Sequence, residues 1–64
     1  MEENNKRSVL IVEDERPLGE ALKHVLEAEG FEVLLAKNGE EGLELAFKHK
    51  PDVITCDIAM PKMD

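Results

Sequence analysis

The chain has 64 residues, a formal net charge of −7 and little aromatic content (3%). A chain of this length forms at most one small domain, in which folding buries only about 60% of the surface of the unfolded chain. The negative charge and the few aromatic rings argue against nucleic acid or an anionic membrane as a partner. No apolar run approaches the length that a membrane span requires.

The N-terminal segment and the cysteine content both predict a cytoplasmic protein. Residues 1–7 form a polar lead without the apolar core of a signal peptide. Cys56 is the single cysteine, so the chain cannot form an intramolecular disulfide. Because Cys56 lies within an apolar run, we expect it to be buried in a strand as a small apolar residue, in a reducing compartment.

The first half of the chain predicts a strand, a helix and a second strand. Residues 8–13, SVLIVE, contain an uninterrupted apolar run from Val9 to Val12, which is typical of a strand covered on both faces. Apolar residues then recur at the spacing of one helix face, at Leu18, Ala21, Leu22, Val25 and Leu26. Pro17 suits the first helical turn, and Gly30 suits the left-handed position after the helix. Residues 31–36, FEVLLA, predict the second strand.

The second half of the chain predicts another helix and a third strand. Asn38 can cap a helix, and Glu41 three residues later completes a capping-box pattern. The basic segment 48–50 suits the negative end of the helix dipole, and Pro51 prevents the helix from continuing. Residues 52–57, DVITCD, then predict a strand that ends in an aspartate.

Alternation of strands and helices predicts an α/β fold with a parallel sheet and right-handed crossovers. We expect three parallel strands in the order 2-1-3, with the first strand in the centre. This order sends the two crossovers in opposite directions, so their helices lie on opposite faces of the sheet. Open parallel sheets bind ligands beyond the carboxyl ends of the strands at the point where this direction reverses.

Three acidic residues are expected at that point. Glu13 and Asp14 end the first strand, and Asp57 ends the third. Three converging carboxylates repel one another, and a divalent cation such as Mg²⁺ or Mn²⁺ would relieve that repulsion. An aspartate beside such a metal is a possible phosphoryl acceptor, because its carboxylate is a nucleophile and the metal neutralises charge on the transferred group.

Structural roles for the same acids remain open from spacing alone. Glu13, Asp14 and Glu15 precede a helix, where acidic side chains stabilise the positive end of its dipole. Asp57 could instead organise the turn before the Met-Pro pair at 60–61. A glycine-rich phosphate-binding loop is excluded, because the turn after the first strand reads EDERP.

The segments VLIVEDE, NGEEGLELA and PDVITCDIAMPKMD together resemble the first half of a response-regulator receiver domain of two-component signalling. The resemblance covers residues 8–64 and implies a flavodoxin-like, doubly wound sheet. It implies that Asp57 is the phosphoacceptor of a sensor histidine kinase and that the chain is not an enzyme. It also implies Mg²⁺ bound by Asp14, Asp57 and the backbone carbonyl of Ala59, with Glu13 holding the ion through water. His24 and His49 match no part of the family's chemistry.

The resemblance also implies that a whole receiver domain is about twice as long as this chain. Its later strands carry a hydroxyl residue and a lysine that contact the phosphoryl group. We therefore expect weak Mg²⁺ binding here, and loss of switching on phosphorylation. The third strand would be an unpaired edge, which invites pairing with a second copy of the chain. Besides the phosphoacceptor module, two alternatives remain: a truncated or engineered half-domain that self-assembles without signalling, and a passive Mg²⁺-binding βαβαβ unit.

Overall fold

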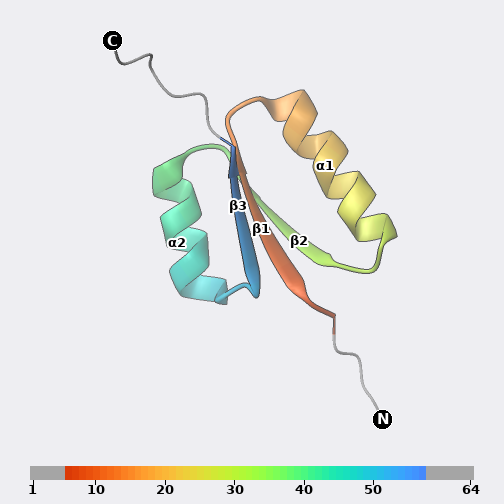
Figure 1. Ribbon diagram of the computed structural model, residues 1–64. Coiled ribbons are helices and arrows are strands. Elements are labelled where there is room, and N and C mark those ends of the chain that lie inside the picture. The colour runs from red at the N-terminus through yellow and green to blue at the C-terminus, as the bar shows by residue number, and fades with distance from the viewer. Residues whose placement is uncertain (1–5, 58–64) are drawn as a thin grey trace.

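The computed structural model of the protein describes residues 6–57 and shows an α/β unit (Figure 1). Its elements are β1 (Ser8–Glu13), α1 (Arg16–Ala28), β2 (Glu32–Ala36), α2 (Gly39–His49) and β3 (Val53–Asp57). Each predicted element is present in the predicted order. The second and third strands each begin one residue later than expected, at Glu32 and Val53. No helix within the described part of the chain is long and apolar enough to cross a membrane.

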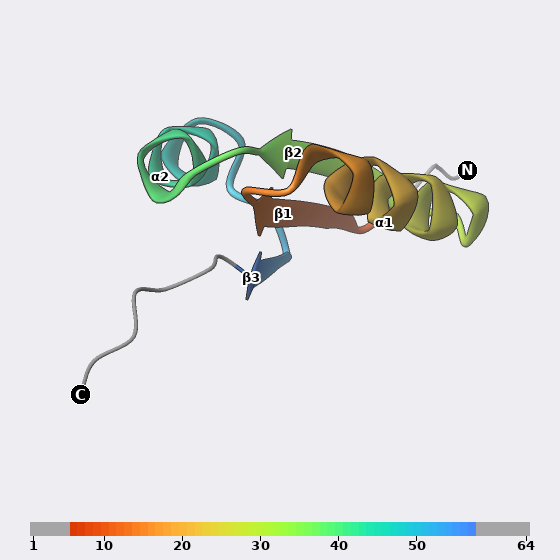
Figure 2. The ribbon, with the colours of Figure 1, turned by 90° about the horizontal axis from the view of Figure 1, so that it is seen from above.

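The sheet has three parallel strands in the order β2-β1-β3, which confirms the predicted topology. Figure 1 shows α1 and α2 on opposite sides of the sheet, and Figure 2 shows the same arrangement from above. Both helices pack against β1 and β2, while β3 lies to the outside of β1 and away from them. The central strand is therefore covered on both faces and β3 is not.

The core is built around β1, as its continuous apolar run predicts. Leu10 and Ile11 are the largest fully buried side chains, with 0% and 1% of their surface exposed. Successive residues of a strand point to opposite faces, so these two side chains serve different sides of the sheet. On the side of α2, the cluster contains Leu10, Val12, Ala36, Leu34, Leu45 and Ala46. Full burial of one such large aliphatic side chain contributes about 1.5–3 kcal/mol.

Both helices end as the sequence indicates, through backbone conformations that satisfy their last carbonyl groups. Gly30 follows α1 with φ of +97°. Its N–H donates to the Glu27 carbonyl, and the N–H of Phe31 donates to the Leu26 carbonyl. This pair of hydrogen bonds defines a Schellman motif, in which glycine avoids the penalty of a left-handed conformation. Lys50 ends α2 with φ of +51°, a left-handed position without a glycine.

The start of α2 confirms half of the expected capping box. The Glu41 N–H donates to Asn38 Oδ1 at 2.7 Å, as predicted. The Glu41 carboxylate, however, accepts from the N–H of Lys37 at 2.8 Å and not from that of Asn38. The second bond of a capping box is thus shifted by one residue, and it ties α2 to the end of β2.

The prediction that Cys56 is buried is wrong, because its side chain is exposed. Val53 and Ile54 on the same strand are also exposed, by 45% and 53%. Apolar composition predicted burial, but β3 lies at the side of the sheet that the two helices do not cover. The apolar stripe of α1 is similarly uncovered, with Leu18 at 41% and Val25 at 59%. Among the described residues, β3 and this face of α1 therefore carry exposed apolar surface.

Candidate functional site at the carboxyl ends of β1 and β3

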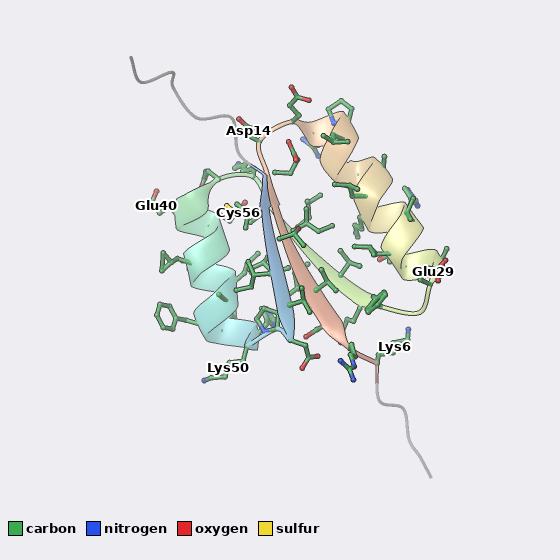
Figure 3. The ribbon with its side chains drawn as sticks, viewed as in Figure 1. Lys6, Asp14, Glu29, Glu40, Lys50 and Cys56 are labelled. Atoms are coloured by element: carbon green, nitrogen blue, oxygen red, sulfur yellow. The ribbon has the colours of Figure 1, made fainter. Side chains whose placement is uncertain are left out.

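The pairing of β1 with β3 places the backbone of Asp57 beside Glu13. In the parallel register Val12 is opposite Cys56, and Glu13 is opposite Asp57. Asp14 follows Glu13 at once, in the turn that leads into α1. Figure 3 shows Asp14 at this end of the sheet. The strand ends that carry the three predicted acids therefore meet at one edge, although the side chain of Asp57 and residue Ala59 lie outside the described atoms.

Glu13 is the buried acid of this group, with 4% of its surface exposed. Its Oε2 accepts a hydrogen bond from the N–H of Glu15 at 3.2 Å. Its Oε1 is buried without a hydrogen-bond partner among the described residues. Gly19 of α1 lies directly over it, since a Cβ built there would be 3.5 Å from Glu13 Cβ. A continuous apolar strand that ends in a buried carboxylate is unusual, because burial of a polar atom without a partner is unfavourable.

Asp14 is exposed and borders a hollow of about 500 Å³ between the β1–α1 turn, α1 and the end of β2. Three basic residues line the same hollow, namely Arg16, Lys23 and Lys37. Arg16 also approaches Glu20 to 4.0 Å on the exposed surface of α1. The acidic edge is thus flanked by cations on the side of β2. Sequence analysis did not find them, because their grouping depends on how α1 crosses the sheet.

The donor types at this edge fit a hard divalent cation, since carboxylate and carbonyl oxygens are the ligands that Mg²⁺ prefers. Within residues 6–57, however, no three His, Cys, Asp or Glu side chains gather closely enough to hold a metal ion. The predicted ligand set of Asp14, Asp57 and the Ala59 carbonyl extends beyond these residues, so it stays a prediction. His24 and His49 are exposed on α1 and α2, as expected for residues without a role at this edge.

The sequence from residue 9 to residue 64 matches the response regulator receiver domain family. The chain belongs to that family, and the order β2-β1-β3 with helices on both faces agrees with a flavodoxin-like sheet.

Several known proteins are similar to this chain. The alkaline phosphatase synthesis transcriptional regulatory protein PhoP of Bacillus subtilis is 40% identical over 58 residues, which covers 91% of the chain and 24% of PhoP. The probable transcriptional regulator ycf27 of Porphyra purpurea is 40% identical over 62 residues, or 97% of the chain and 26% of the relative. Protein-glutamate methylesterase/protein-glutamine glutaminase 1 of Oleidesulfovibrio alaskensis is 50% identical over 58 residues, or 88% and 16%. The chain thus spans about a quarter or less of the length of these relatives.

Proposed function

We propose that this protein is a phosphoacceptor module of two-component signalling and that Asp57 accepts the phosphoryl group. The single observation that carries the proposal is the parallel register of β1 and β3, in which Glu13 and Asp57 are opposite each other. That register brings the acidic turn after β1 to the end of the strand that carries Asp57. Membership of the receiver family supports the same assignment.

In the proposed reaction a carboxylate oxygen of Asp57 attacks the phosphorus of a phosphohistidine or of a small acyl phosphate. A new O–P bond forms, the N–P or O–P bond of the donor breaks, and imidazole or a carboxylate leaves. A bound Mg²⁺ would neutralise charge on the transferred group. Asp14, Asp57 and the Ala59 carbonyl would hold the ion, and Glu13 would hold it through water.

We propose a sensor histidine kinase as the phosphodonor, place the chain in the cytoplasm and assign it no enzymatic activity of its own. Phosphate-stabilising groups are charged or strongly polar, and each contributes about 1.5–3 kcal/mol. Among the described residues, Arg16, Lys23 and Lys37 lie on the side of β2, whereas Asp57 ends β3 on the other side of β1. We therefore expect Mg²⁺ to bind weakly and the phosphorylated form to be short-lived.

A second copy of the chain is the proposed protein partner besides the kinase. The observation that favours it is the exposed apolar surface of β3 and α1, to which Val53, Ile54 and Val25 contribute. Apolar residues on an uncovered strand promote pairing between chains. Self-association without phosphorylation is accordingly the second candidate function, and passive Mg²⁺ binding is the third.

Incubation with acetyl phosphate and Mg²⁺, followed by intact-mass measurement, separates these functions. We expect the mass to increase by one phosphoryl group, and we expect Asp57→Asn or removal of Mg²⁺ with EDTA to abolish the increase. Asp52→Asn is the matched control, because it removes one acid from the opposite end of β3 and should leave the adduct in place. Mg²⁺ binding without an adduct would favour the passive unit. An adduct that survives Asp57→Asn would contradict the proposal.

A further inference from the structure

Glu13 has a geometry that differs from that of an exposed metal-site acid. Only 4% of its surface is exposed, and Oε1 is enclosed without a partner among the described residues. Asp14, the next residue, is exposed. The two adjacent acids therefore differ in exposure, although both line the hollow between the β1–α1 turn, α1 and the end of β2.

The one hydrogen bond recorded for Glu13 spans Asp14. Oε2 of Glu13 accepts from the N–H of Glu15 at 3.2 Å. Glu15 is the N-cap residue of α1, but its own side chain makes no capping hydrogen bond to the first helical turn, and that turn contains no acidic residue. Unbonded N–H groups at a helix start favour a nearby negative charge. The Glu13 carboxylate therefore accepts a hydrogen bond and places negative charge at the start of α1. Asp14 lies between the two residues that this hydrogen bond joins.

Gly19 provides the space that the Glu13 side chain occupies. A Cβ at Gly19 would lie 3.0 Å from Leu35 Cδ1 and 3.5 Å from both Cβ and Cγ of Glu13. Gly19 is buried, although it lies only three residues inside the exposed start of α1. The lack of a side chain at Gly19 therefore lets α1 approach the end of β1 closely, over the Glu13 side chain.

We infer that Glu13 is a positioning residue: its carboxylate holds the Glu15 N–H and thereby fixes the turn that presents Asp14 to a divalent cation. This inference rests on the proposed function, because it assigns Glu13 a role in building that metal site. It assigns the Glu13 carboxylate a role as acceptor for the Glu15 N–H, in addition to its proposed water-mediated contact with the ion.

Two substitutions of similar size separate the acceptor from the charge. Glu13→Gln removes the charge and keeps an oxygen that can accept from the Glu15 N–H, whereas Glu13→Met removes both. Loss of a residue that orients a metal ligand typically weakens metal binding about 10–100-fold. We expect Glu13→Met to weaken Mg²⁺ binding within this range and Glu13→Gln to weaken it by less than about tenfold. Equal weakening by the two variants would overturn the inference.

Hydrogen exchange of the Glu15 amide, followed by NMR, is the second measurement. We expect protection in the wild-type protein and in Glu13→Gln, and fast exchange in Glu13→Met. Glu20→Met is the control, because Glu20 lines the same hollow but makes no bond to this turn among the described contacts. Glu20→Met should change neither the affinity for Mg²⁺ nor the exchange rate of the Glu15 amide.

The exchange measurement keeps this inference separate from the proposed function. If the wild-type protein binds no Mg²⁺, the proposed function fails while exchange at Glu15 still reports the bond. If Glu13→Met does not fold, an unprotected Glu15 amide in the wild-type protein overturns the inference.

Discussion

The strands β1 and β3 lie side by side, and both are largely apolar, yet their environments are opposite. Leu10 of β1 is fully buried, while Ile54, its partner in the register, is 53% exposed. The difference comes from position in the sheet, because both helices pack against β1 and β2 (Figure 2). Apolar sequence alone therefore does not determine burial, because within residues 6–57 two helices cover β1 and β2 but not β3.

This contrast has a consequence for function. The packed region, formed by β1, β2 and the helices, contains the buried core. The aspartate proposed to accept phosphate ends β3, the strand with the least cover. Besides backbone pairing with β1, β3 is tied down at its start, where Asp52 Oδ2 accepts from the N–H of Ser8 at 2.8 Å. The phosphoryl transfer proposed for Asp57 would therefore depend on a strand that is held mainly along one edge.

The largest expected effect comes from shortening the side chains of Leu10 and Ile54, which are paired across β1 and β3 but differ in burial. Leu10→Ala removes a fully buried side chain and should cost about 2–5 kcal/mol of unfolding free energy. Ile54→Ala should cost about 1 kcal/mol or less, because half of the side chain is already in water. Urea denaturation followed by circular dichroism measures both. Similar losses at the two positions would mean that β3 is covered in solution, as self-association predicts.

The turn between α1 and β2 provides the next effect, within the packed region. Gly30→Ala places a Cβ at φ of +97° and should cost about 1–2 kcal/mol. Gly39→Ala is the control, because a Cβ there meets nothing within 4 Å and alanine favours the helix. In thermal unfolding, the melting temperature should fall for Gly30→Ala and rise for Gly39→Ala. An unchanged melting temperature for Gly30→Ala would contradict the Schellman motif.

A smaller effect is expected where β3 is tied to β1. Asp52→Ala removes the acceptor for the Ser8 N–H and should lower the unfolding free energy by about 1 kcal/mol. Asp52→Asn keeps an acceptor oxygen and should recover most of this loss. Hydrogen exchange of the backbone amides is the more specific measurement. In Asp52→Ala the amides of β3 should exchange faster than in the wild-type protein, and the amides of β2 should change less. Equal acceleration in the two strands would show that Asp52 does not act locally.

The smallest effect is a gain in stability at the end of α2, before the chain enters β3. Lys50 has φ of +51°, which is unfavourable for a residue with a Cβ. Lys50→Gly should raise the unfolding free energy by about 0.5–1 kcal/mol. Lys48→Gly is the control: Lys48 lies inside α2, where glycine should instead be destabilising. A loss of stability for Lys50→Gly would place the helix end elsewhere.

The architecture could be predicted from the sequence because each local signal agrees with its neighbours. The apolar run of β1, the helix-ending Gly30 and the capping Asn38 all act within a few residues. Alternation of strands and helices then restricts the topology to few possibilities. The order β2-β1-β3 was predictable for this reason.

Features that depend on how elements cross one another were not predictable from periodicity. Cys56 is exposed because no described helix is centred on β3, which local sequence does not encode. The burial of Glu13 depends on the close approach of Gly19, and a glycine within a helical pattern gives no sign of it. The roles predicted for Asp14 and Asp57 follow from the resemblance to receivers and stay predictions.

Paramagnetic broadening by Mn²⁺, in place of Mg²⁺, tests most directly whether the ends of β1 and β3 form one metal site. Backbone amide signals of Asp14 and Asp57 should broaden together at low Mn²⁺ concentration. Signals of Ser8 and Asp52 at the other end of the sheet should stay sharp. Broadening centred on the acidic start of α2, at Glu40 and Glu41, would contradict the account, as would an ion that broadens Asp14 without Asp57.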